Sequence, residues 1–463
     1  MPPRAGLVLA FSLTFVVGGS LALRASEESA LRHGAHPVQG WAPRRCVTDT
    51  LTVLGDSATL ASVDTVAPGL TYRCMLDRRG PWLLHVVTLD LRNPGYVLDG
   101  ARALGAFFGR EKVSAMASRL AEKGEAPLVG INADFFDLRT GEVENNHVVL
   151  GEWVKGVVVT DSPHDDFDNA HTQFAVDERG RPLIGRFELH GLVISASRNE
   201  PLLGINHRPA RRAGLVLFTP WYGTATPRDT STRLPPVARD STGAPRSIPE
   251  LRADSARRLA AAATRDAREV VLRRLGRRED TLLYRVESRS ELTGGGTAIP
   301  SYGAVLSATG HAREMVDELI RTRGVVKVVA RLGTWSTPPR AVVGGWPRVV
   351  TGGVNVGVVA DSLEGTMPRF SSARHPRSAI AISGDSSQLM LVVVDGRRPW
   401  SVGMSLSELA DALIALGARD AMDLDGGGSS TLWIRGAVVN YPSDAAGERA
   451  VGNALFVRRR SAR

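Results

Sequence analysis

Three consecutive glycines, Gly426 to Gly428, interrupt an otherwise strand-like region in the stretch DLDGGGSSTLW (423–433). Consecutive glycines cost backbone entropy and give a strand interior no side chains to pack. The apolar segments AMDL and STLWI flank them, and a turn at Arg435-Gly436 follows. The stretch therefore predicts a strand–loop–strand unit. The loop is either a tight turn with bulges or a place where another group approaches the backbone.

A phosphate is one candidate for that group. Backbone N–H groups in a glycine turn can form a concave anion site, and the hydroxyls of Ser429 and Ser430 would extend it. The nucleotide-binding motif, however, needs Gly-Lys-Ser/Thr at the start of a helix. Here no lysine follows and the loop joins two strands. The pattern therefore argues against nucleoside triphosphate binding.

The chain has 463 residues with a formal net charge of +9, which raises the question of a nucleic-acid partner. The arginines are scattered, and no basic segment with interleaved aromatic residues is present. We therefore expect no nucleic-acid partner, and interpret the charge as a solvated basic surface. The 48 glycines suggest many turns and a β-rich body.

The N-terminus predicts export. Arg4 precedes an apolar run from Ala5 to Leu23, so residues 1–23 form a signal peptide or a retained membrane anchor. Either alternative places the rest outside the cytoplasm, as a secreted, periplasmic or cell-envelope protein, and membrane contact follows only if the segment is retained. In an oxidising compartment, Cys46 and Cys74 would form a disulfide; two buried thiols are the alternative.

Hydrophobic periodicity predicts an α+β fold, a mostly antiparallel sheet covered by helices, with an inserted β-rich subdomain. Helices are expected over 110–124, 251–276 and 404–418, the last with a capping box at Ser405 and Glu408. Residues 224–250 are expected to form a mobile surface loop. The expected segments are a linker and small segment (24–79), a main domain in two parts (80–185 and 341–458) and the insert (186–340).

Several motifs together resemble the phosphodiester glycosidase family. AMDLDGGGSSTLW is similar to its signature, and GINADFFDLRTGE, VVGGWPRVVTGG, RHPRSAIAIS and NYPSDAAGERAVGNALFV are similar to further family segments in the same order. The resemblance covers roughly 80–160 and 340–457. It implies a hydrolase that cleaves a sugar-1-phosphate ester in a glycan or cell-surface polymer such as an exopolysaccharide. The family usually has asparagine at Asp423 and two glycines at Ala133-Asp134, so Asp134 and Asp423 inherit no role.

Three residues are the catalytic candidates. Asp425, at a strand end beside the glycine loop, is the expected base or nucleophile, although it could instead cap the loop's own N–H groups. Arg377 would grip two phosphate oxygens, or else form a structural ion pair with a carboxylate at the sheet end. Glu448 is the second candidate acid or base, with a surface salt bridge as its alternative.

The expected substrate-binding residues surround the same motifs. Asn132 would bind a sugar hydroxyl, and Phe136 would either stack on a sugar or belong to the core. The full set is Asn132, Phe136, His375, Asp395, Arg397, Gly426, Gly427, Gly428, Ser429, Ser430 and Arg449. The sequence has no His/Cys/Asp cluster with transition-metal spacing, and no cofactor is assigned. A calcium or magnesium ion held by loop oxygens is left open.

Two other functions compete with this interpretation. One is a non-catalytic module of the envelope that binds anionic glycans, which would keep the glycine loop without needing Asp425 as a base. The other is a glycosidase that acts on a polysaccharide without phosphate.

Overall fold

The computed structural model describes residues 52–460, except for 55, 161, 163–168, 211, 229–247, 288–291, 334 and 336. All of them belong to one compact unit, Pro43–Arg463. The predicted signal segment, the linker before residue 52, Cys46 and most of the predicted mobile loop lie outside the described residues. Within the described part of the chain, no helix combines the length and apolarity needed to span a bilayer.

The fold is mostly β, so the predicted α+β class is wrong. Strands make up 45% of the structure and helices 18%, and seven strands close into a barrel. The reason lies partly in residues 268–276, which were expected to continue a helix. Helix α3 (Ile248–Ala263) ends earlier, and Arg268–Arg278 form strand β14, whose Val270 and Leu272 point into the barrel core.

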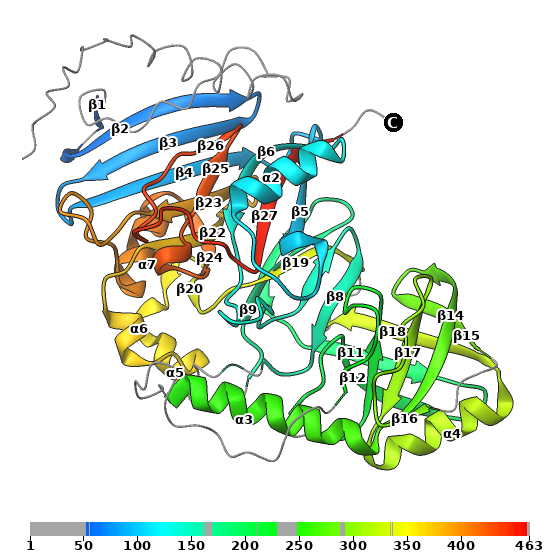
Figure 1. Cartoon of the computed structure of the whole chain (residues 1–463). Helices are drawn as coiled ribbons and strands as arrows, with labels where there is room; N and C mark the ends of the chain where they lie inside the picture. Colours follow the sequence, from blue (N-terminus) through cyan, green and yellow to red (C-terminus); the bar gives the residue numbers. More distant parts are fainter. Residues whose placement is uncertain are drawn as a thin grey trace, which may run out of the picture. The chain divides into compact units, whose positions relative to one another are not determined.

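A nine-stranded antiparallel sheet carries the N-terminal strands and the strand before the glycine loop (Figure 1). Its order is β1 (Thr52–Leu54), β2 (Asp56–Ala67), β3 (Leu70–Asp77), β4 (Trp82–Asp90), β23 (Gln388–Val394), β22 (Arg377–Ser383), β24 (Ala418–Asp423), β20 (Arg348–Thr351) and β21 (Val354–Asn355). Helix α7 (Leu406–Ala415) packs its apolar side on β22–β24 and begins with the predicted capping box of Ser405 and Glu408. That helix prediction is confirmed.

A five-stranded sheet receives the chain after the glycine loop. Its order is β26 (Ala437–Val438), β25 (Leu432–Ile434), β6 (Ala126–Asn132), β27 (Asn453–Arg459) and β5 (Tyr96–Arg102). Helix α2 (Val113–Glu122) packs Met116 and Leu120 against this sheet. The glycine loop therefore carries the chain from one sheet to the other, which places it between their strand ends.

The third sheet contains the barrel. It runs through β10 (Pro182–Arg186), β9 (Thr172–Asp177), β19 (Pro339–Gly344), β7 (His147–Val149), β8 (Glu152–Val157), β12 (Asn199–Ile205), β11 (Leu189–Ile194), β18 (Val325–Leu332), β15 (Thr281–Val286), β14, β17 (Gly303–Ala308) and β13 (Leu215–Phe218), with β16 (Leu292–Thr293) paired to β14. Pairing of β12 with β13 closes the barrel. Apolar residues of α4 (Arg313–Thr322) join its core.

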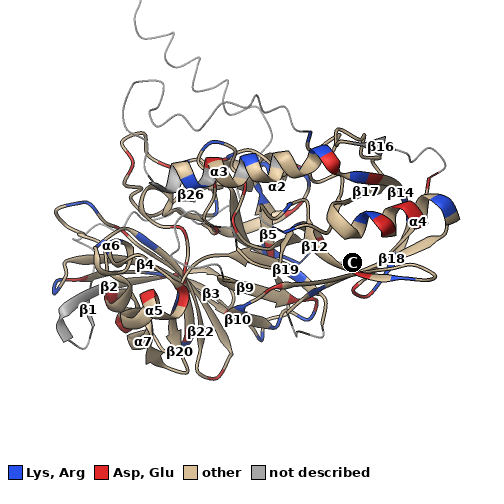
Figure 2. Ribbon diagram, turned by 90° about the horizontal axis from the view of Figure 1, so that it is seen from below, with Lys and Arg blue, Asp and Glu red and all other residues tan. Residues whose placement is uncertain are grey.

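The surface charge is mixed in sign along the ribbon. Figure 2 shows Lys and Arg next to Asp and Glu on α4, and ion pairs such as Arg268–Asp317 at 2.6 Å connect opposite charges there. The excess of positive charge in the sequence is thus spread over a surface with interspersed carboxylates. It gives little information about the charge of any one site.

Candidate active site

The glycine loop is anchored on both sides by strand ends. At the end of β6, Ala133 accepts a hydrogen bond from the Asp425 N–H (2.8 Å), and the Asn132 side-chain amide donates to the Asp425 carbonyl (2.6 Å). Just before β22, the Pro376 carbonyl accepts from the Gly427 N–H (2.9 Å). Residues 425–427 are therefore held between the two sheets, in a fixed backbone conformation.

The glycines are required by the protein's own groups. A Cβ on Gly428 would lie 2.0 Å from Asp444 Oδ1 and 2.1 Å from Arg449 Nη2, which form an ion pair against the loop. A Cβ on Gly427 would lie 3.0 Å from Arg397 Nη2, and the φ of Gly427 is +62°. The expectation that a phosphate or sugar accounts for the missing side chains is therefore wrong at Gly428. Side chains of the protein occupy that space.

Asp425 carries a carboxyl group at the start of the loop. The side chain of Asp425 is only half-buried, yet burial raises its pKa to about 7. A hydrogen bond from Ser429 and the charge of Arg449 oppose that rise, whereas the nearby charges of Glu144 and Asp134 add to it. Asp425 is therefore a carboxyl group that can exchange a proton near neutral pH and that solvent can reach.

Arginine side chains also lie against the loop. Arg449 binds Asp444 through Nε (2.7 Å) and Nη2 (3.0 Å) and donates from Nη1 to Ser429 Oγ (3.3 Å). Arg397 is exposed and donates to Ser443 Oγ (3.3 Å). Burial, followed by the charges of Arg377, Arg397 and Arg369, lowers the pKa of His375. A protonatable carboxyl and exposed positive charge thus belong to the surroundings of one glycine turn.

A family model described as phosphodiester glycosidase matches residues 286–458 of this chain. The chain contains a phosphodiester glycosidase domain. The N-acetylglucosamine-1-phosphodiester alpha-N-acetylglucosaminidase of Bos taurus is 36% identical over 80 residues, which are 17% of this chain and 15% of the bovine protein. The SPbeta prophage-derived uncharacterized protein YomE of Bacillus subtilis is 36% identical over 86 residues, 19% of this chain and 13% of that protein.

The fold also has a structural counterpart. A hypothetical protein from Synechocystis superposes with a TM-score of 0.59 over 86% of this chain and 64% of that chain, at 20% identity. At this identity the likeness concerns the fold alone. The matched segments of the curated relatives cover well under a quarter of their length, so those relatives support the family rather than a whole-protein activity.

Within the glycosidase domain, Arg377 does not occupy a position from which it could grip phosphate. Its side chain is fully buried, with Nη1 2.9 Å from Asp423 Oδ2, Nε donating to the Met404 carbonyl (2.9 Å) and Nη2 donating to the Phe370 carbonyl (2.8 Å). The guanidinium also lies over the Phe370 ring, 4.8 Å from its centroid. The structural alternative, an ion pair at the sheet end, fits this geometry.

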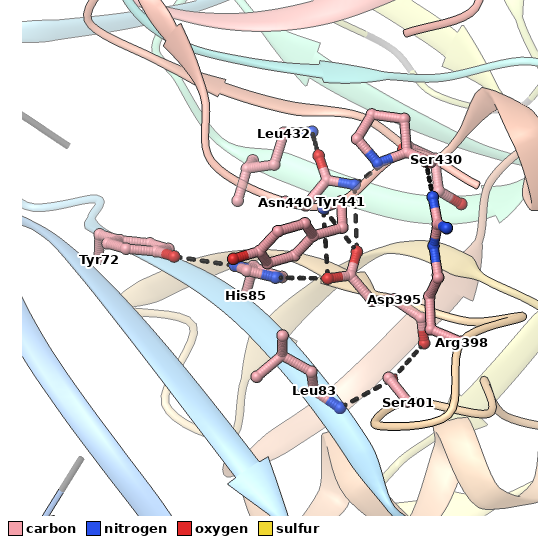
Figure 3. A network of polar contacts seen from close by, with 11 residues as sticks. Tyr72, Leu83, His85, Asp395, Arg398, Ser401, Ser430, Leu432, Asn440 and Tyr441 are labelled. Carbon is pink, nitrogen blue, oxygen red and sulfur yellow. Dashed lines mark hydrogen bonds and ion pairs between the residues drawn. The ribbon is translucent and has the colours of Figure 1, made fainter. Parts of the chain in front are cut away.

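Two predicted substrate contacts are instead part of the scaffold. Asn132 is fully buried, and its Oδ1 accepts from Ser378 Oγ (2.8 Å) and the Thr431 N–H (3.0 Å). Asp395 is also buried and binds His85 Nε2 (3.0 Å), the Asn440 side chain (3.3 Å) and the Tyr441 N–H (3.0 Å) (Figure 3). Neither side chain is exposed to solvent. Both hold the loops that surround the glycines.

Phe136 and Glu448 also make structural contacts. Phe136 is 8% exposed and belongs to the core beneath α2, as its alternative interpretation stated. Glu448 accepts hydrogen bonds from the Ser114 N–H (2.9 Å) and Ser114 Oγ (2.5 Å) in the first turn of α2. A carboxylate at this position satisfies free N–H groups and interacts favourably with the helix dipole.

This position predicts the effect of replacing Glu448. Glu448→Ala is expected to lower the free energy of unfolding by about 1–2 kcal/mol, the usual cost of losing a helix cap. Because the hydrogen bonds of Glu448 are with Ser114 and not with the glycine loop, kcat should stay near that of the wild type. Chemical denaturation together with steady-state kinetics measures both quantities. A large loss of kcat in a folded variant would restore Glu448 as an acid or base.

Other predicted site residues do gather around the loop. Arg397 and Arg449 lie against the loop, Ser429 belongs to it, and His375 is near enough to Arg397 for that charge to help lower its pKa. Ser430 is buried, and its Oγ has no hydrogen-bond partner among the described residues. Their roles toward a substrate stay predictions.

Cys74 is buried on β3 and disulfide-bonded, while Cys46 lies outside the described residues, so the predicted pairing also stays a prediction.

Residues that the sequence left without a role are close to the centre of the site. Asp134 is buried and accepts from the Asn145 N–H (2.9 Å) and side-chain amide (2.7 Å), and its charge acts on Asp425. Glu144 acts on Asp425 in the same way. The acidic residues inside GINADFF and VENN were a usable signal, although only the fold shows that the charges of both act on Asp425. The described residues contain no cluster arranged to hold a metal ion.

Asp134 predicts a specific dependence of stability on pH. Burial raises its pKa to about 7, so the folded protein retains a proton that the unfolded chain loses near pH 4. The free energy of unfolding should therefore fall as the pH rises from about 4 to about 7, by roughly 2–4 kcal/mol for this group. Asp134→Asn should flatten that slope, and the exposed Asp266→Asn should not. Unfolding at a series of pH values tests this, and an unchanged slope would contradict it.

Proposed function

We propose that this domain hydrolyses glycosyl phosphodiesters, with Asp425 as the base that activates water. The observation that carries the proposal is the placement of a half-buried carboxyl, with its pKa raised to about 7, beside Ser429 and Arg449, with the exposed Arg397 against Gly427 of the same loop. Near neutral pH a substantial fraction of Asp425 would be ionised and able to accept a proton.

The charged groups around the loop suit the cleavage of a glycosyl phosphodiester bond. The leaving group of a glycosyl phosphodiester is an anionic phosphate monoester, which needs charge stabilisation more than protonation. Arginine donors are suited to that task, because a guanidinium binds phosphate oxygens through charge-assisted hydrogen bonds. Arg397 replaces Arg377 in this role, since it is exposed and its guanidinium adjoins Gly427. The name of the bovine relative supports a sugar-1-phosphodiester as the substrate class.

We further propose that the substrate lies outside the cytoplasm, in a glycan or cell-surface polymer. The apolar run from Ala5 to Leu23 supports this location. Mass spectrometry of the mature protein from the native host tests this location, because it shows whether the segment is retained or removed. Recovery of the protein with the segment intact in a cytoplasmic fraction would contradict export.

Product analysis tests the reaction. The purified protein is incubated with a panel of sugar-1-phosphodiesters and with matched glycosides that have an alcohol leaving group. We expect free sugar and a phosphate monoester from at least one diester and no cleavage of its matched glycoside. Cleavage of both classes would indicate an ordinary glycosidase, and tight binding of diesters without cleavage would indicate a glycan-binding module.

Inhibition by inorganic phosphate tests the assignment of Arg397. Arg397→Gln keeps much of the side-chain length but removes the charge, so phosphate should inhibit the variant about tenfold more weakly. Arg313→Gln, on the exposed side of α4, is the matched control and should behave as wild type. Equal inhibition of the wild type and the Arg397 variant would remove Arg397 from the phosphate site.

A further inference from the structure

The outer wall of the barrel carries a group of cations that the proposed reaction does not use. Strands β17, β14, β15 and β18 lie side by side in the barrel (Figure 1). Alternate side chains of these strands, such as Leu272 and Tyr284, belong to the buried core. The residues between them therefore face outward. On this outer side, the exposed cations are Arg273, Arg285 and Lys327.

Backbone pairing places these cations next to one another. Arg273 on β14 is directly opposite Arg285 on β15, and Arg285 is directly opposite Val325 on β18. Lys327 is two residues further along β18, so it projects from the same side of the sheet as Val325. Like charges directly opposite each other on neighbouring strands destabilise a sheet. The arginine pair therefore costs stability, and proteins break such local rules mainly where function requires it.

The positive charge on this side of the barrel is only partly neutralised by the protein itself. Arg273 Nε lies 3.6 Å from Glu287 Oε1, and the next cation along β18, Arg331, forms an ion pair with a carboxylate. Arg285 and Lys327 have no ion-pair partner in the part of the chain that the structure describes. Two exposed cations are thus available to an anionic partner.

Large apolar side chains are exposed around the same cations. Tyr302 is 85% exposed, and its carbonyl accepts a hydrogen bond from the Arg274 N–H on β14 (3.0 Å). Leu275 is 44% exposed and is the extra residue of a bulge in β14, and Val325 is 43% exposed. A group of this kind, unlike an isolated exposed side chain, marks an interaction surface. The outer barrel face is the surface formed by Arg273, Leu275, Arg285, Tyr302, Val325 and Lys327.

We infer that the outer barrel face binds an anionic lipid bilayer. The surface of such a bilayer attracts lysine and arginine, and its interfacial region is a favourable environment for tyrosine and for aliphatic side chains. One partner therefore satisfies both the unpaired cations and the exposed apolar groups. A soluble polyanion engages the cations alone and leaves Leu275, Tyr302 and Val325 in water.

Co-sedimentation with lipid vesicles tests the inference. The protein used lacks residues 1–23, because that apolar run could bind any bilayer and lies outside the compact unit that begins at Pro43. The vesicles contain either phosphatidylcholine alone or equal parts of phosphatidylcholine and phosphatidylglycerol. At low ionic strength we expect the affinity for the anionic vesicles to be about tenfold higher or more, and added salt should lower it.

Two double variants separate the contribution of charge from that of apolar contact. Arg285→Gln with Lys327→Gln removes the unpaired cations and should weaken binding to the anionic vesicles about tenfold or more. Leu275→Ser with Tyr302→Ser removes exposed apolar groups and leaves the charge unchanged. It should also weaken binding to the anionic vesicles, by about tenfold, because these groups no longer enter the interfacial region.

A matched control tests whether net charge alone explains the binding. Arg78→Gln with Lys123→Gln removes one exposed arginine from the turn between β3 and β4 and one exposed lysine from the end of α2. This variant has the same net charge as the first double variant and should bind like the wild type. Arg285→Gln alone removes the like-charge pair with Arg273, so it should unfold at the same urea concentration as the wild type or at a higher one.

Three results would overturn the inference. One is equal affinity of the wild type for neutral and anionic vesicles, and another is an equal loss of binding in the control variant. The third is wild-type vesicle binding by the variant with Leu275→Ser and Tyr302→Ser, while the variant with Arg285→Gln and Lys327→Gln loses binding both to vesicles and to dextran sulfate. The face would then be a site for soluble polyanions. Hydrolysis does not enter the test, so its outcome is independent of the proposed function.

Discussion

Asp425→Asn is expected to reduce kcat for a verified glycosyl phosphodiester by about 10²–10⁴-fold, the usual contribution of an acid–base group. The amide has nearly the same volume and can still accept a hydrogen bond from Ser429, so the loop should keep its conformation. Because the variant loses the proton acceptor but keeps the arginines beside the loop, KM should change by only a few fold. Steady-state kinetics on the purified variant gives both values.

The pH profile supplies an independent measurement. If Asp425 acts in its ionised form, kcat/KM should rise with pH and level off above the Asp425 pKa of about 7. The Ser429 hydrogen bond lowers that pKa. Ser429→Ala should therefore move the rising limb to higher pH while the plateau is largely kept. Wild-type turnover by Asp425→Asn, or a limb that does not move in Ser429→Ala, would refute the assignment of Asp425 as base.

Local patterns in the sequence were sufficient for several elements. Consecutive glycines between apolar segments predicted a strand–loop–strand unit, and β24 and β25 do flank a glycine loop. Ser405 and Glu408 predicted the start of α7, because a capping box involves only neighbouring residues. These signals depend on a few adjacent positions. They therefore hold whatever the rest of the chain does.

Features that depend on distant contacts could not be predicted in the same way. The barrel closes through pairing of β12 with β13, and it also requires β11 to pair with β18, more than 100 residues further along the chain. Residues 268–276 were predicted to be helical because charged and apolar residues are compatible with either period over a short window. In the folded protein, pairing with neighbouring strands makes this segment a strand.

Prediction of the site from the sequence is limited in the same way. Asp134 follows β6 and Asp425 follows β24, which belong to different sheets, so nothing in the local sequence shows that their charges interact. The two alternatives for Arg377 also required the fold to choose between them. Only the placement of Asp423 opposite the start of β22 shows which carboxylate the guanidinium pairs with.

Arg377→Met is expected to lower the free energy of unfolding by about 3–5 kcal/mol, because it leaves Asp423 buried without its ion-pair partner. Both side chains are fully buried, and Asp423 Oδ1 already has no hydrogen-bond partner among the described residues. Burial raises the pKa of Asp423 to about 7 and Arg377 opposes that rise, so removal of the cation should raise the pKa further. The destabilisation should then be largest at alkaline pH and smaller at acid pH, where Asp423 is protonated.

A second substitution distinguishes this role from phosphate binding. Asp423→Leu in the Arg377→Met background removes the stranded carboxylate, and a buried pair replaced by apolar residues is often neutral or even stabilising. The double variant should therefore regain most of the stability lost by the single one, and it should still be inhibited by inorganic phosphate because Arg397 is intact. Urea denaturation and phosphate inhibition of the refolded proteins measure both. If instead the single variant unfolds like wild type but loses phosphate inhibition, Arg377 is a phosphate ligand and its ion pair with Asp423 contributes little to stability.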